Sequence, residues 1–127
     1  MLENFALWFL VASFIGLAGF QLSLAMGAKL GEFAFGGANP GRLPRNFRLA
    51  SSLSALVAVA LSGHYLAEIG IFVSLLDSTG RTIANWVFFG FLALNTIANN
   101  VSKSRPERLL WGPISLAMAA SALIVAL

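Results

Sequence analysis

Long apolar runs separated by short polar segments dominate this chain. Four of them approach the roughly 20 residues that an α-helix needs to cross about 30 Å of hydrocarbon. They cover about residues 5–27, 49–70, 82–100 and 107–127. Because backbone groups surrounded by lipid must be paired inside their own segment, we expect each run to be a helix. The pattern therefore predicts an all-α fold, an integral membrane four-helix up-down bundle that occupies residues 1–127 as a single domain.

The composition favours the same interpretation. The chain is 58% hydrophobic and only 10% charged, whereas about a quarter of the residues in a soluble domain are charged. A soluble fold would expose much of this apolar surface to water and would aggregate. The first four residues lack the basic region of a signal peptide, and the apolar run that follows is too long for one. We therefore expect the first run to be a membrane span.

The basic residues set the expected orientation. Seven of the eight flank or occupy the segments 28–48 and 101–106, and only Arg81 lies between the second and third runs. Positively charged loops stay in the cytoplasm, so both segments should be cytoplasmic loops and both termini extracytoplasmic. Six of these side chains are also candidates to contact anionic lipid head groups, although topology alone would supply the same charges. They are Arg42, Arg45, Arg48, Lys103, Arg105 and Arg108.

His64 and Glu68 are the only ionisable residues well inside an apolar stretch, four positions apart on one helical face. Such a pair could relay protons, bind a cation or steer a substrate amine. Its depth argues for a simpler role. Counting from Arg48, a helical rise places His64 roughly 24 Å and Glu68 roughly 30 Å up, near the outer head groups. We expect the two to pair locally at that interface, unless a longer helix reaching Leu76 draws them deeper.

A second polar cluster lies at the cytoplasmic end of the third run. It contains Asn95, Asn99 and Asn100, with Gln21 of the first run at a similar depth. Hydrogen bonds between helices are one interpretation, and a polar cavity open to the cytoplasm is the other.

Small residues recur along one face of three runs. Between membrane helices they permit close backbone approach, so we expect them to pack within the chain, or else to dock another subunit. The three sets are Ala12, Gly16, Gly19, Ser23 and Gly27; Ala50, Ser54, Ala58 and Ser62; and Ser115, Ala119, Ala122 and Ala126.

The two cytoplasmic loops carry turn and capping signals. The first is rich in glycine and proline and contains Phe33 and Phe35, which suit an ordered loop at the membrane surface. At the fourth run, Ser104 and Glu107 have the spacing of a capping box, in which Glu107 reaches back to the Ser104 N–H.

The two loops and the adjoining helix ends share a pattern of residues with other proteins. It consists of Leu30-Gly31, Gly36-Gly37, Gly41, Leu43-Pro44, Arg48 and Ser51, and of Asn99, Ser102, Ser104, Glu107-Arg108, Trp111 and Pro113. In this pattern the chain resembles a group of uncharacterised small four-span bacterial membrane proteins. The resemblance implies the four-span architecture and a bacterial inner (plasma) membrane, and it implies no activity, cofactor or site.

Several functions are disfavoured by residue types alone. The chain has no cysteine and one histidine, which excludes disulfides and thiolate sites and argues against zinc or a haem held by two histidines. We expect no catalytic residue, metal, cofactor or nucleic-acid partner. The leading hypothesis is a non-enzymatic accessory or structural subunit that packs with lipids and other membrane chains, as a homo- or hetero-oligomer. The rival is a small homo-oligomeric transporter or channel using His64 and Glu68 or the asparagine cluster. An enzyme acting on a lipid or quinone has the least support.

Overall fold

The computed structural model describes all 127 residues and contains four α-helices and no strand. The prediction of an all-α fold is confirmed, and each helix lies within a few residues of its apolar run. The helices are α1 (Leu2–Ala25), α2 (Arg45–Ile69), α3 (Ser78–Asn100) and α4 (Arg105–Ala126), with the 3-10 turns η1 (Gly31–Phe33) and η2 (Phe35–Gly37) between α1 and α2.

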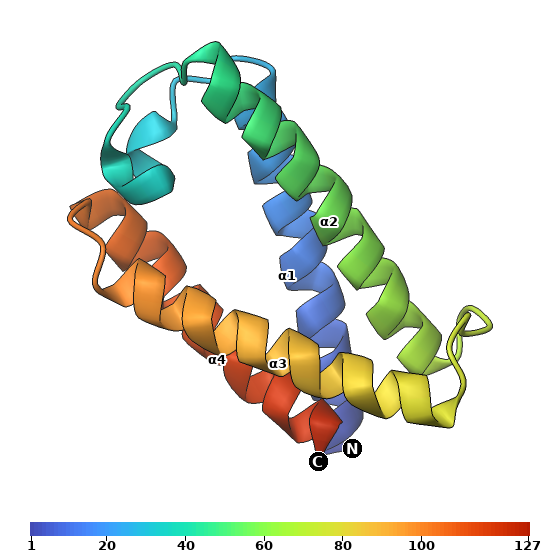
Figure 1. Ribbon diagram of the computed structural model, residues 1–127. Coiled ribbons are helices and arrows are strands. Elements are labelled where there is room, and N and C mark those ends of the chain that lie inside the picture. Colours follow the sequence, from blue (N-terminus) through green and yellow to red (C-terminus); the bar gives the residue numbers. More distant parts are fainter.

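The helices form two antiparallel hairpins, α1–α2 and α3–α4, that diverge from one end of the molecule (Figure 1). Both chain termini lie at the end where the hairpins meet, and there α1 also packs against α4. At the other end, η1 and η2 lie against the start of α4. The helices therefore follow the expected up-down order, but toward the other end the two hairpins stand apart (Figure 1). We call the half with the termini the closed end and the half with η1 and η2 the open end.

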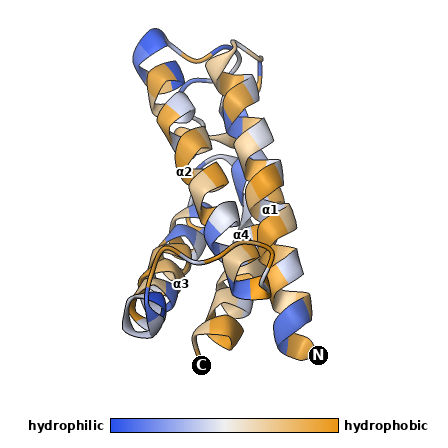
Figure 2. Ribbon diagram, turned by 90° about the vertical axis from the view of Figure 1, so that its right-hand side faces the viewer, coloured by the Kyte–Doolittle hydropathy of each residue, from blue (hydrophilic) through white to orange (hydrophobic).

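Three of the four helices, α1, α2 and α4, are long and apolar enough to cross a membrane. Helix α3 has 23 residues, but asparagines at positions 85, 95, 99 and 100 interrupt its apolar sequence. Apolar residues cover the helices along their length, and hydrophilic residues gather where α2 begins (Figure 2). The length and composition of the helices thus suggest a membrane protein.

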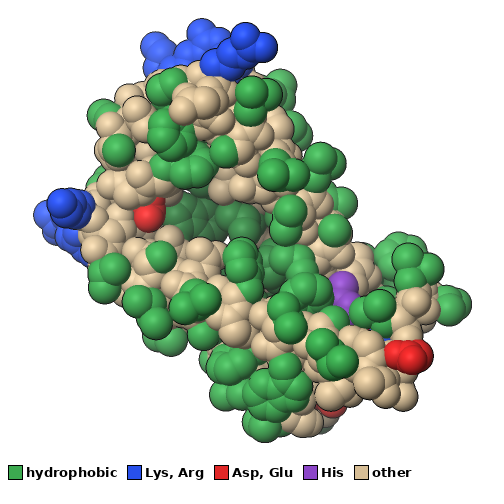
Figure 3. All heavy atoms as spheres, in the orientation of Figure 1, with side chains coloured by type: hydrophobic (Ala, Val, Ile, Leu, Met, Phe, Trp, Pro, Cys, Tyr) green, Lys and Arg blue, Asp and Glu red, His purple; other side chains and the backbone are tan.

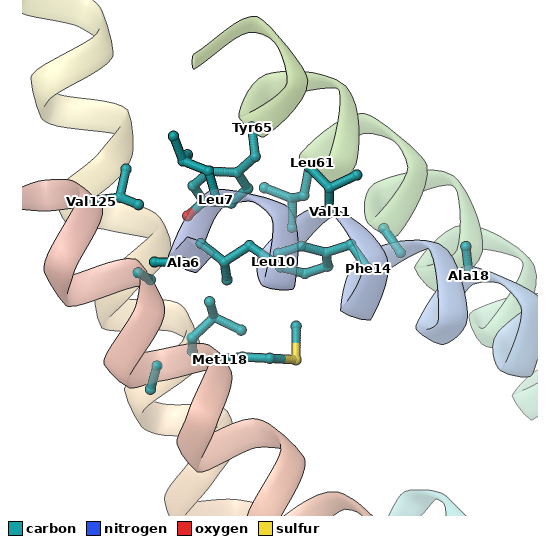
Figure 4. Packing of buried hydrophobic residues seen from close by; sticks show 14 residues of the cluster. Ala6, Leu7, Leu10, Val11, Phe14, Ala18, Leu61, Tyr65, Met118 and Val125 are labelled. Atoms are coloured by element: carbon teal, nitrogen blue, oxygen red, sulfur yellow. The ribbon is translucent and has the colours of Figure 1, made fainter. Parts of the chain in front are cut away.

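The main hydrophobic core occupies the closed end. There α1 lies between α2 and α4 (Figure 4). Leu10 and Tyr65 are fully buried, and Phe14 of α1 stacks on Tyr65 of α2 at a ring-centre distance of 6.0 Å. Met118 and Ala122 close the core from α4. The most densely packed part of the molecule is therefore the half in which α1 contacts both neighbouring helices.

The loop between α1 and α2 carries a small core of its own. Leu24, Ala34 and Leu43 are buried together at the open end. The Gly31 N–H donates to the Gly41 carbonyl at 2.8 Å, and a Cβ at Gly31 would lie 1.9 Å from the Asn39 carbonyl oxygen. A glycine is thus required where the loop closes on itself. The expected packing of this loop on the helix ends is present, and its order stays a prediction.

Helix α2 ends earlier than its apolar sequence does. Gly70 adopts φ 102°, and its N–H donates to the Leu66 carbonyl, which terminates the helix. Asp77 then caps α3 by accepting from the Gly80 N–H at 2.7 Å. The alternative of a longer helix reaching Leu76 is therefore wrong, because glycine and aspartate set helix boundaries that hydropathy alone does not register.

The three sets of small residues differ in burial. On α4, Ser115, Ala119 and Ala122 are buried inside the chain, as expected for packing. Ala58 and Ser62 of α2 are buried as well. The α1 set faces outward: Ala12, Gly16, Gly19 and Ser23 are all exposed. For α1 the expectation of packing within the chain is wrong, because α1 turns its larger residues toward α2 and α4.

Candidate functional site

A cavity of about 670 Å³ separates the two hairpins at the open end. It is visible as a hollow through the side of the molecule (Figure 3). Of its 22 lining residues 14 are hydrophobic, so most of its wall suits an apolar ligand. All four helices and η1 and η2 contribute to the wall. The apolar lining includes Phe14, Leu17 and Phe20 of α1, Phe33 and Phe35 of the loop, Val57 and Leu61 of α2, Phe91 of α3, and Trp111 and Met118 of α4.

Polar side chains line the cavity near the loops. Gln21, Asn95 and Asn99, which the sequence grouped by depth, all face this space. The Gln21 Oε1 atom is buried without a hydrogen-bond partner. Neither Asn95 nor Asn99 uses its side chain in a hydrogen bond to the rest of the protein. The polar-cavity interpretation of this cluster therefore agrees with the geometry for three of its four members.

Asn100 is the exception, because it turns toward α4. Its Nδ2 atom donates to the Thr96 carbonyl at 2.8 Å and to the Gly112 carbonyl at 3.3 Å. A Cβ at Gly112 would lie 2.7 Å from Asn100 Oδ1, so glycine is what allows this side chain to lie against α4. Asn100 therefore connects the α3–α4 hairpin and takes no part in the cavity.

Glu107 adds a carboxylate to the polar wall of the cavity. The residue is only 7% exposed, and its Oε2 atom accepts a hydrogen bond from the Gly36 N–H of η2 at 3.0 Å. It forms no ion pair, since the single ion pair of the chain lies elsewhere. Its position in the first turn of α4 favours a negative charge, because the helix N–H groups point toward it. A buried carboxylate with one hydrogen bond retains capacity to accept more.

Ser104 connects the loop to the same helix start. Its Oγ atom donates to the Glu32 carbonyl and accepts from the Glu107 N–H at 3.4 Å, so it caps α4 as predicted. The second half of the predicted capping box is wrong. The Ser104 N–H donates to Ser102 Oγ at 3.1 Å, while the Glu107 carboxylate reaches across to Gly36. Tertiary contact with the loop has replaced the local bond, and this frees Glu107 to line the cavity.

The His64 and Glu68 side chains lie at the closed end, outside the cavity. They do not bond to each other; Asn85 of α3 connects them. His64 Nε2 lies 2.7 Å from Asn85 Oδ1, and Asn85 Nδ2 donates to Glu68 Oε2 at 3.4 Å. Arg81 Nε donates to Glu68 Oε1 at 2.7 Å and forms an ion pair. This network ties α2 to α3, which otherwise have little contact.

Aromatic contacts connect His64 to the main core. His64 meets Tyr65 and Phe88 edge-on, each at a ring-centre distance of 5.0 Å. Tyr65 is fully buried. His64 Nε2, both Glu68 oxygens and Arg81 Nε are bonded within α2 and α3, so the network forms a contact between the hairpins.

The predicted lipid-contacting residues all lie at the open end, outside the cavity (Figure 3). Arg48 Nε donates to the Ala25 carbonyl at 3.1 Å, and Arg108 donates to the Ser102 carbonyl at 2.7 Å. Arg42 lies against Gly27. Arg45, Lys103 and Arg105 are exposed. These three and Arg42, which is also exposed, can reach a membrane surface, whereas Arg48 and Arg108 are also bonded to loop and helix-end carbonyls.

Sequence reasoning missed Glu107, Asn85 and Arg81. Glu107 was assigned to a local cap. Asn85 gave a usable signal, since it is a polar residue inside an apolar run, but its partner on α2 depends on how the two hairpins meet. No three His, Asp or Glu side chains lie together in a group that could hold a metal ion.

Comparisons with models of protein families, with curated proteins and with solved structures find no match.

Proposed function

We propose that this chain is an integral membrane protein that crosses the bilayer four times and acts as a non-enzymatic subunit, packing with another membrane chain. The bacterial plasma membrane is the membrane we propose, with both termini outside the cytoplasm. Three apolar helices support insertion into a bilayer. Because both termini lie at one end (Figure 1), an even number of crossings fits the fold, and α3 would be the fourth span, packed along α4.

The charge distribution supports the proposed orientation. The two basic loops come together at the open end, where Ser104 and Glu107 bond to Glu32 and Gly36. Arg81 is the one basic residue at the opposite end. Seven positive charges at one end and one at the other favour a cytoplasmic open end.

The outward face of α1 carries the proposed subunit role. Ala12, Gly16, Gly19 and Ser23 are spaced by four, three and four residues and are all exposed. The space over Gly16 and Gly19 is empty within 4 Å. The Ser23 hydroxyl donates to the Gly19 carbonyl at 2.8 Å, so this face exposes no unpaired side-chain hydroxyl to lipid. A helix that docks here would gain close backbone contact, which drives association in a bilayer.

The rival function, a small transporter or channel, draws its support from the asparagine cluster alone, since Asn95 and Asn99 line the cavity. His64 and Glu68 do not line it, and His64 Nε2 and the Glu68 carboxylate are bonded to Asn85 and Arg81. A proton or cation path through these residues would have to break the contact between α2 and α3.

Purification in a mild detergent tests the subunit role. We expect the chain to run as a complex larger than one copy, and a Gly16→Ile, Gly19→Ile double variant to run as a single chain because the added side chains separate the helices. Gly90→Ile is the matched control, since Gly90 of α3 also has open space around it and lies off the α1 face. A native chain that is monomeric in mild detergent and forms no crosslinks in membranes would refute the proposal.

A further inference from the structure

We propose that the cavity at the open end binds a membrane amphiphile with an apolar chain and a polar end that donates hydrogen bonds and carries no negative charge, such as an alcohol or an amine. This goes beyond the subunit role. Phe14, Leu17 and Gln21 line the cavity from one side of α1, and the exposed Gly16–Gly19 face lies on another, so either site can exist without the other.

The volume of the cavity suits a small amphiphile. At about 670 Å³ it falls within the roughly 300–1,000 Å³ of small-molecule sites. A transmembrane helix about 30 Å long and 10 Å wide would occupy about 2,400 Å³, so the cavity is too small to hold a helix. The hollow opens on the side of the molecule, between the hairpins (Figure 3). A chain can therefore enter sideways from hydrocarbon.

The wall changes character along its length. Phe14, Leu61 and Met118 lie toward the closed end, while Gln21, Asn99 and Glu107 lie toward the loops. A ligand with one apolar and one polar end matches this order, its chain pointing toward the closed end and its head toward the loops.

Two buried acceptors at the polar end of the cavity have unused capacity. Glu107 presents a buried carboxylate with a single hydrogen bond, and Gln21 presents a buried Oε1 with none. No lysine or arginine lines the space. Leaving buried acceptors without donors is unfavourable, so a hydroxyl or amine between them is stabilised. An anionic head would face Glu107 with no cation to balance it.

Quenching of Trp111 fluorescence tests this proposal. Trp111 lines the cavity and lies 5.0 Å from Phe20, ring centre to ring centre. With Trp8→Phe and Trp86→Phe as the background, Trp111 is the only emitter. The probes are octanol and octanoic acid, each with a bromine at the far end of the chain as a quencher, titrated into the full-length chain in nanodiscs. Octanol without bromine serves as a competitor that does not quench.

We expect saturable quenching by bromo-octanol, reversed by octanol, with bromo-octanoate binding about tenfold or more weakly, the effect of one lost hydrogen bond to a charged group. Glu107→Gln retains an acceptor for the Gly36 N–H and should abolish the preference for the alcohol. Ala98→Phe adds bulk inside the cavity and should weaken bromo-octanol binding about tenfold, whereas Ile97→Phe, on an exposed residue that does not line it, should leave binding unchanged.

Two results would overturn the proposal. Quenching that rises without saturation and is equal in the Ala98→Phe and Ile97→Phe variants would mean partitioning into the bilayer alone. Equal or tighter binding of bromo-octanoate to the chain with native Glu107 would mean that the head group is not selected by acceptors. Neither result depends on whether the α1 face docks a partner.

Discussion

The His64 network at the closed end and the cavity wall at the open end treat polar side chains in opposite ways. At the closed end, His64, Asn85, Glu68 and Arg81 satisfy one another between α2 and α3. At the open end, Gln21 and Glu107 face a cavity with unused capacity. Polar groups that are paired inside the protein hold its parts together, whereas unpaired groups on a cavity wall are available to a ligand. The ionisable pair that is most conspicuous in the sequence thus lies in a contact between α2 and α3, whereas the less conspicuous Glu107 lines the cavity.

The largest expected effect is a difference in stability between leucine variants of the packed closed end and of the cavity wall. Leu10→Ala should lower the free energy of unfolding by about 2–5 kcal/mol, because Leu10 is fully buried in the main core and its removal leaves a cavity. Leu53→Ala, on the cavity wall at 64% exposure, should cost less than about 0.5 kcal/mol. Reversible unfolding in mixed micelles measures both. Similar losses for the two variants would remove the distinction between a packed and an open end.

A smaller difference in stability is expected between alanine variants of two asparagines on α3, one at each end of the molecule. Asn85→Ala should cost about 1–3 kcal/mol, since Asn85 is 7% exposed and its loss leaves His64 and Glu68 without a shared partner. Asn95→Ala should change stability little, because Asn95 makes no side-chain hydrogen bond within the protein. The same unfolding measurement applies. A destabilising Asn95→Ala together with a neutral Asn85→Ala would reverse the comparison.

Local sequence signals predicted much of the fold. Hydropathy located the four helices, the glycines and prolines indicated a packed first loop, and Ser104 marked the start of α4. These features depend on residues close together in the chain. The depth of Gln21, Asn95 and Asn99 was also enough to suggest a polar cavity.

The remaining features depend on the angle between the hairpins, which no local pattern specifies. The sequence predicted an up-down bundle and left open whether the α1 small residues pack inside it or dock another subunit. In the structure, α1 packs its larger residues against α2 and α4 and leaves Gly16 and Gly19 exposed. Glu107 fits a capping box by spacing, and only the approach of η2 to α4 redirects it to Gly36. The partners of Asn85 lie on α2, so they depend on the contact between α2 and α3 and cannot be read from the sequence around Asn85.

The proposed four-span topology requires that α3 cross the membrane, so that the open end faces the cytoplasm. The chain has no cysteine, so single cysteines introduced at exposed positions report their side without background. Ala38→Cys lies in the first loop, Val73→Cys precedes α3, and Lys103→Cys follows it. Each variant is treated in intact cells and in inverted vesicles with a maleimide that cannot cross the membrane.

We predict that the Val73→Cys variant reacts in intact cells, and that the Ala38→Cys and Lys103→Cys variants react only in inverted vesicles. Labelling of the Val73→Cys and Lys103→Cys variants from the same side would contradict the account, because α3 would then not cross and the four-span topology would be wrong.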